Sequence, residues 1–189
     1  MLYAQVHLTL PGWLHDLDLL DRKYVGDEAQ VALAIELSER NVLNQSGGPF
    51  GAAMFDGEGR LLGVGVNRVV PQNCSVAHAE MMAFMTTQQR VQRFRVNDTA
   101  PGSGSPFTLA TSAQPCCMCY GASFWAGIDR LLIGARAEDV MELTEFDEGP
   151  LPADWVGELE RRGISVHRDL LRDRARDVLR RYGESGAAY

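Results

Sequence analysis

The segment FTLATSAQPCCMCYGASFWAG, residues 107–127, places a strand pattern directly before a cysteine-rich helix pattern. Its first seven residues are mostly apolar or β-branched, which is typical of a buried strand. The residues after Pro115 predict a helix, and Gly127 predicts where that helix ends. A strand joined to a helix by a short connection is typical of α/β folds.

The segments on either side continue this alternation of strands and helices. A helix is predicted from Asp27, with acidic residues in its first turn, an apolar stripe that reaches Leu43, and a stop at Gly47–Gly48. The other predicted elements are strands at 50–55, 61–66, 129–136 and 164–169 and helices at 75–94, 137–143, 154–163 and 170–184. The alternation predicts an α/β protein, built as a three-layer α/β/α sandwich around a single sheet.

A chain of 189 residues is expected to form one main domain. Residues 1–26 carry two glycines and a proline and predict an irregular arm, with one helical turn near 14–20. We place the main domain at 27–182 and a short tail at 183–189.

Composition excludes several classes of partner. The formal charge is −7, whereas a nucleic-acid-binding protein usually presents a basic surface, so no nucleic acid is expected to bind. The sequence has no run of 18 apolar residues that could cross a membrane, and its first residues lack the charged start of a secretory signal. Three of the four cysteines are clustered in CCMC, which favours metal or redox chemistry in the cytoplasm over a disulfide framework.

The cysteine cluster predicts a metal site. Cys116 and Cys119 lie three residues apart, so in the first turn of a helix both thiols would face the same side. The N-terminus of a helix favours the thiolate form of these side chains. His78, at the start of the helix predicted at 75–94, supplies a third ligand. Three protein ligands leave one position of a tetrahedral zinc ion open to water, which is the catalytic type of zinc site.

Glu80 follows His78 by two residues and can carry a proton without binding the metal. The combination H-x-E with P-C-x-x-C is the signature of zinc-dependent deaminases. Cys117 points away from its neighbour on a helix and is predicted to be a small core residue, and Cys74 is predicted to be structural.

At these residues the sequence resembles the cytidine-deaminase superfamily, and within it the bacterial guanine deaminase branch. The resemblance runs from about Asp27 to the C-terminus, and three further segments carry it: GGPFGAAMF at 47–55, GVNRVV at 65–70 and FDEGP at 146–150. It implies a mixed five-stranded sheet between helices, a bound zinc ion, and generally a homodimer. The implied reaction is hydrolytic removal of ammonia from a small heterocyclic substrate.

The resemblance also implies roles for individual residues. Phe50 would line the base pocket, Asn67 would hold a ring carbonyl or ring nitrogen, and Trp125 would place an aromatic ring against the substrate. Glu148 would contact the purine and help to move protons. Tyr189, the last residue, resembles a C-terminal lid over the pocket.

Several alternatives stay open on the sequence alone. Gln114 stands where many relatives have Glu, so ring selectivity could differ; guanine leads, followed by isoguanine-like, cytosine-like and triazine rings.

A tRNA adenosine deaminase would share the zinc motif, and the eight arginines of residues 161–181 favour it. However, the aspartates three residues before Arg172, Arg176 and Arg180 predict salt bridges on a solvated helix. A third alternative is a structural zinc ion with Cys117 or Cys74 as its fourth ligand.

Overall fold

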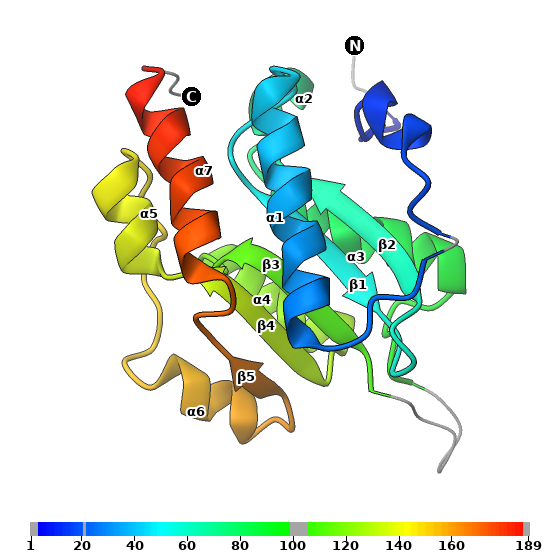
Figure 1. Ribbon diagram of the computed structural model, residues 1–189. Coiled ribbons are helices and arrows are strands. Elements are labelled where there is room, and N and C mark those ends of the chain that lie inside the picture. The colour runs from blue at the N-terminus through cyan, green and yellow to red at the C-terminus, as the bar shows by residue number, and fades with distance from the viewer. Residues whose placement is uncertain (1–3, 21, 99–105, 187–189) are drawn as a thin grey trace.

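A computed structural model describes residues 4–20, 22–98 and 106–186. It contains a five-stranded sheet in the order β2-β1-β3-β4-β5 (Figure 1). The strands are β1 (Gly51–Phe55), β2 (Leu61–Val66), β3 (Thr108–Ala113), β4 (Arg130–Ala135) and β5 (Ser165–His167). Strand β1 is antiparallel to β2 and β3, whereas β3, β4 and β5 are parallel. The predicted mixed sheet is confirmed.

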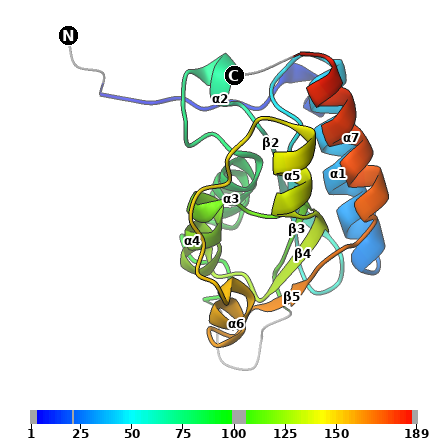
Figure 2. The ribbon, with the colours of Figure 1, turned by 90° about the vertical axis from the view of Figure 1, so that its left-hand side faces the viewer.

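Helices cover both faces of the sheet (Figure 2). On one face lie α1 (Asp27–Leu43) and α7 (Arg172–Glu184), with α5 (Ala137–Leu143) beside α7; on the other lie α3 (Ala79–Val91) and α4 (Cys117–Ala126). Two short helices, α2 (Val69–Gln72) and α6 (Trp155–Glu160), complete the set. The strands alternate between the two cores: Ala53 and Phe55 pack under α1, whereas Met54 packs under α3. The three-layer sandwich is therefore confirmed.

Some predicted boundaries differ from the structure. The helix predicted at 75–94 begins only at Ala79, and α2 precedes it. Leu43, predicted on the buried stripe of α1, is 70% exposed because it is the last residue of the helix. Helix α7 begins at Arg172, two residues later than predicted, and ends at Glu184 as predicted. The turn in the arm is a 3-10 helix at Gly12–Asp16, and Leu14 is buried against the same core as α1.

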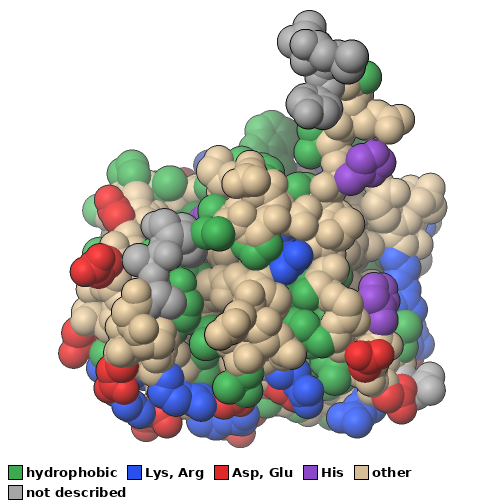
Figure 3. All heavy atoms as spheres, turned by 90° about the horizontal axis from the view of Figure 1, so that it is seen from above, with side chains coloured by type: hydrophobic (Ala, Val, Ile, Leu, Met, Phe, Trp, Pro, Cys, Tyr) green, Lys and Arg blue, Asp and Glu red, His purple; other side chains and the backbone are tan. Residues whose placement is uncertain are grey.

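The arginines of residues 161–181 are largely paired with acids. Arg172 and Arg176 bind the buried Asp139, Arg180 binds Asp177, and Arg181 binds Glu39. Basic and acidic side chains are interspersed along the lower edge of the surface in Figure 3. This pattern fits a solvated, salt-bridged helix rather than a basic strip. Within the described residues, no helix has the length and apolar character needed to span a bilayer.

Most of the predicted site residues lie at one end of the strands, where β3 ends and β1 begins. Strand β3 ends at Ala113 and is followed by Gln114, and the antiparallel β1 begins at that end just after Phe50. Helices α3 and α4 both start nearby, and α3 lies very close to β2 because Gly65 has no side chain. A Cβ added to Gly65 would overlap the backbone of Ala79 and Ala83.

Candidate zinc centre and substrate pocket

His78, Cys116 and Cys119 converge at the N-termini of two helices. His78 is the N-cap of α3, Cys116 is the N-cap of α4, and Cys119 lies in the first turn of α4. Their ligand atoms all lie within 4.8 Å of one another. The Sγ of Cys116 lies 3.5 Å from the Nδ1 of His78. The structure thus brings together the three ligands that the sequence predicts.

The electrostatics of this cluster favour a cation. The hydrogen bond with the Cys119 thiol lowers the pKa of Cys116 to about 4, against the opposing effect of burial. The same hydrogen bond, together with burial, raises the pKa of Cys119. One thiolate is therefore stabilised by the other thiol and by the helix N-terminus, and a divalent cation would stabilise both as thiolates.

The donor set fits zinc. One imidazole nitrogen and two thiolate sulfurs are the ligands of a catalytic zinc ion that keeps its fourth position open. Among the residues that the structure describes, no fourth His, Cys, Asp or Glu joins this cluster. Neither Cys117, which is exposed, nor Cys74, which is partly buried, belongs to this cluster. The exposure of Cys117 also corrects the prediction that it is a core residue: its thiol lies against Gly149 in a surface loop.

A cavity of about 310 Å³ opens next to the cluster. Its walls combine aromatic, acidic and amide side chains with two of the metal ligands: Phe50, His78, Glu80, Gln114, Cys116, Glu145, Phe146, Asp147 and Glu148. Both predicted proton carriers, Glu80 and Glu148, therefore face the same space as His78. Gln114 is 7% exposed and puts a neutral amide in the position where the resemblance expects a carboxylate.

Two carboxyl groups in this cavity have pKa values that are raised to near neutral pH. Burial raises the pKa of Glu80 to about 7, and the negative charge of Cys116 adds to the effect. Burial also raises the pKa of Glu148 to about 8, with the charges of Cys116 and Glu80 adding to it. A cation bound at the cluster would lower both values, because it offsets the thiolate charge. Carboxyl groups with pKa values near neutrality are suited to exchange protons with a substrate.

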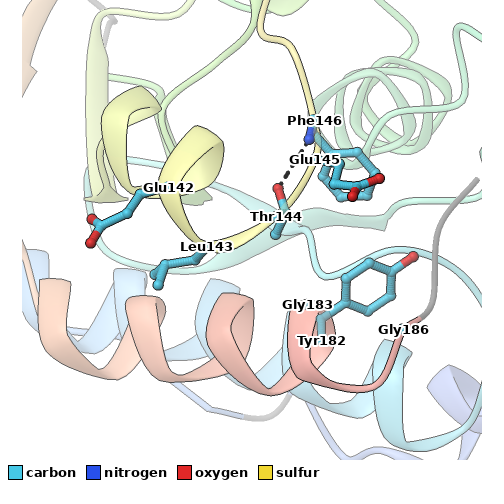
Figure 4. Close-up of a pocket in the computed structure, with 8 residues that line it drawn as sticks. All are labelled: Glu142, Leu143, Thr144, Glu145, Phe146, Tyr182, Gly183 and Gly186. Atoms are coloured by element: carbon cyan, nitrogen blue, oxygen red, sulfur yellow. Dashed lines mark hydrogen bonds between the residues drawn. The ribbon is translucent and has the colours of Figure 1, made fainter.

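An aromatic residue that the sequence reasoning missed completes the pocket. The ring of Phe146 lies 5.5 Å from that of Phe50 and 5.8 Å from that of Tyr182. Phe146 follows α5, and its backbone N–H donates to the Thr144 hydroxyl at 3.2 Å (Figure 4). On its other side, next to Tyr182, lies a second hollow of about 300 Å³. The signal was present in FDEGP, where an aromatic residue stands directly before the acids.

Asn67 directly follows β2 at the same end of the sheet, and it is not among the described residues that line the cavity. Its side-chain Oδ1 accepts hydrogen bonds from the backbone N–H groups of Gly48 and Val69, at 3.3 and 3.2 Å. Its own backbone N–H donates to the carbonyl of Phe50 at 3.1 Å. In the structure, Asn67 therefore holds the backbone that carries Phe50 into the pocket.

Trp125 is placed away from the pocket of its own chain. It lies in the last turn of α4, 74% exposed, with its ring 6.1 Å from that of Phe124. Because α4 begins at the metal ligands, eight residues of helix carry Trp125 about 12 Å from Cys117. Trp125 is not among the described residues that line this cavity, so its contact with substrate stays a prediction. Tyr189 lies outside the described residues, and its role as a lid stays a prediction.

Comparison with known proteins identifies the family. A family model described as the cytidine and deoxycytidylate deaminase zinc-binding region matches residues 25–135. The crystal structure of a guanine deaminase from Nitrosomonas europaea is 38% identical, covers 97% of this chain and 99% of that one, and superposes with a TM-score of 0.87.

Two curated relatives show how widely the family's substrates range. Guanine deaminase of Bacillus subtilis is 31% identical over 115 residues, which cover 61% of this chain and 67% of that protein. The tRNA-specific adenosine deaminase of Buchnera aphidicola is 29% identical over 131 residues, 69% of this chain and 77% of that protein. The cluster at His78, Cys116 and Cys119 falls within the matched region. The chain belongs to the cytidine and deoxycytidylate deaminase zinc-binding family and is a hydrolytic deaminase that acts on C–N bonds.

Proposed function

We propose that this protein is a zinc-dependent deaminase of a free base, with guanine as its substrate. The observation that carries the proposal is that the partly buried Glu148 lines the same cavity as Glu80, His78 and Cys116. A second acid beside the reacting ring is what a purine with several N–H donors requires. The similarity to guanine deaminase over nearly the whole chain supports the same choice.

Aromatic and acidic groups would orient the base in the cavity. Phe50 and Phe146 offer ring faces against which a planar base can pack. Glu148 can accept hydrogen bonds from the ring N–H and amino groups of guanine, and in its protonated form it can donate to a ring nitrogen. Direct contact of Asn67 with the substrate stays a prediction, because the described contacts of Asn67 support Phe50.

The reaction replaces the amino group of the ring by an oxygen atom from water. A zinc ion held by His78, Cys116 and Cys119 would supply a Lewis acid that lowers the pKa of water. Glu80 accepts a proton from the attacking water and delivers it to the departing amine, so a C–O bond forms, the C–N bond breaks and ammonia leaves. Burial holds the Glu80 carboxyl next to His78 and keeps bulk water from competing for its proton.

A screen of ammonia release tests the substrate. Zinc-loaded protein is assayed with guanine, adenine, cytosine, an aminotriazine, guanosine and tRNA. The proposal expects the highest kcat/KM for guanine and little turnover of guanosine, because the cavity of about 310 Å³ is at the small end for a ligand site. Turnover of guanosine or tRNA without turnover of guanine would overturn the proposal. A preference for the triazine or cytosine would keep the mechanism and replace the substrate.

The assembly is proposed to be a homodimer. Trp125 and Phe94 are 74% and 82% exposed, and large exposed apolar side chains can contribute to an interaction surface. Light scattering on the purified protein would give the mass of two chains, and a mass of one chain would contradict the proposal.

A further inference from the structure

The backbone of Glu148 is attached to the helix that carries the two cysteine ligands. The N–H of Cys117 donates to the carbonyl of Glu148 at 3.0 Å. Cys117 is the first residue of α4, and the N–H groups in the first turn of a helix have no partner within the helix. The Glu148 carbonyl therefore caps the helix turn that holds Cys116 and Cys119.

A close steric contact accompanies this hydrogen bond. Gly149 has a φ of +67°, and a Cβ added there would lie 2.7 Å from the Sγ of Cys117 and 3.5 Å from its Cβ. The N–H of Gly149 donates to Oδ1 of Asp147 at 2.9 Å, which closes a tight turn around Glu148. A side chain at position 149 would therefore meet the Cys117 thiol unless the thiol or the loop moved.

We propose that Cys117 and Gly149 are positioning residues for Glu148. The Cys117–Gly149 contact and the Cys117 hydrogen bond fix the Glu148 backbone relative to Cys116 and Cys119, and so hold the Glu148 residue at the side of the cavity where these ligands lie. The role of the carboxyl rests on the proposed function, whereas the attachment of the loop rests on the contacts alone. A displacement of about 1 Å in such a group can cost about 100-fold in rate.

A double-mutant cycle tests this inference. Gly149→Ala is expected to lower kcat by about 10-fold to 100-fold with unchanged zinc content, because the new methyl group pushes the loop off α4. Cys117→Ala alone is expected to lose only a few-fold. The double variant should recover most of the loss, because its nearest contact becomes the 3.5 Å distance to the remaining Cβ.

Gly163→Ala is the matched control. Gly163 has a φ of +82°, and an added Cβ would meet nothing within 4 Å. This variant carries the same backbone strain without the contact, so its kcat should equal that of the wild type. A double variant as slow as Gly149→Ala, or a Gly149→Ala variant with wild-type kcat, would overturn the proposal.

Hydrogen exchange at the Cys117 amide tests the attachment of the loop independently of the proposed substrate. The amide of Cys117 should be protected in the wild type, exposed in Gly149→Ala and protected again in the double variant. A wild type that releases no ammonia from guanine would refute the proposed substrate, while the exchange pattern still decides the attachment. Equal exchange in all variants would refute the attachment, whatever the activity.

Discussion

Glu148 and Glu80 occupy one cavity, yet they lie on different elements and would carry different tasks. Glu80 lies in the first turn of α3, two residues after His78, whereas the partly buried Glu148 lies in the loop after α5. Glu148→Gln keeps the size of the side chain and removes its ability to exchange a proton. We expect kcat/KM for guanine to fall by about 100-fold at unchanged zinc content. Steady-state kinetics measure this, with Glu142→Gln as a control outside the cavity; equal kinetics for wild type and Glu148→Gln would exclude Glu148 from the reaction.

Phe146 is expected to act on binding rather than on proton transfer. Phe146→Leu keeps an apolar side chain but removes the ring face beside Phe50, and aromatic pairing contributes about 0.5–1.5 kcal/mol beyond burial. The KM for guanine should therefore rise by about 3-fold to 10-fold, with kcat nearly unchanged. A change in kcat alone would show that the ring does not pack against the base.

The site residues that could be predicted from the sequence are those that lie close to one another along the chain. His78 and Glu80 are two residues apart, and Cys116 and Cys119 share one helix turn, so short-range geometry sets their directions. Trp125 could not be placed in this way, because its position depends on where α4 points after leaving the site. Phe146 was missed because its role depends on a ring from the distant Phe50.

Among the elements, α3 packs on β2 so closely that no side chain fits at Gly65. Gly65→Ala would drive a methyl group into the backbone of Ala79 and Ala83, at the start of the helix that carries His78. Overpacking of this kind costs about 1–3 kcal/mol, so the midpoint of thermal unfolding should fall by several degrees. Zinc content should fall with it, because the His78 imidazole moves with α3.

Gly121→Ala in α4 provides the contrast for this prediction. A Cβ at position 121 would meet nothing within 4 Å, and alanine is favoured over glycine in a helix by about 0.5–1 kcal/mol. The midpoint should stay or rise slightly. A Gly65→Ala protein as stable as the Gly121→Ala protein would contradict the tight packing of α3 on β2.

Strand and helix patterns predicted the layers because apolar periodicity reports which face of an element is buried. The alternation of Ala53, Met54 and Phe55 between the two cores is one example. Element ends were less predictable. Helix α2 and the late start of α3 depend on a turn in which the N–H of Arg68 donates to the carbonyl of Ala77 at 2.8 Å, a contact that no local pattern reveals.

At the scale of the whole molecule, Asp27 connects the first residue of α1 to strands β4 and β5 through side-chain hydrogen bonds. Its carboxylate accepts hydrogen bonds from Arg130 at 2.8 and 2.9 Å and lies 2.8 Å from the Nδ1 of His167. Burial alone would raise the pKa of Asp27, but the hydrogen bonds from Arg130 and His167 outweigh it and hold the pKa below its usual range.

Acid should therefore weaken the fold through Asp27. A depressed folded pKa contributes stability that is fully present above the unfolded pKa of about 3.9 and is lost as the pH falls through the folded value. Asp27→Asn should lower the free energy of unfolding by about 1 kcal/mol at pH 7 and by less below pH 4. Urea unfolding at both pH values measures the difference. The same loss at both would contradict an ionised Asp27 as its source.

If His78, Cys116 and Cys119 hold a zinc ion and Glu80 moves the protons, zinc-loaded Glu80→Gln should lose activity without losing its metal. Ammonia release is measured on this variant, with metal content and thermal unfolding recorded on the same sample. We expect one zinc ion per chain, an intact fold, and a rate lower than that of the wild type by about 100-fold or more. Ammonia release at the wild-type rate from that variant would contradict this role of Glu80.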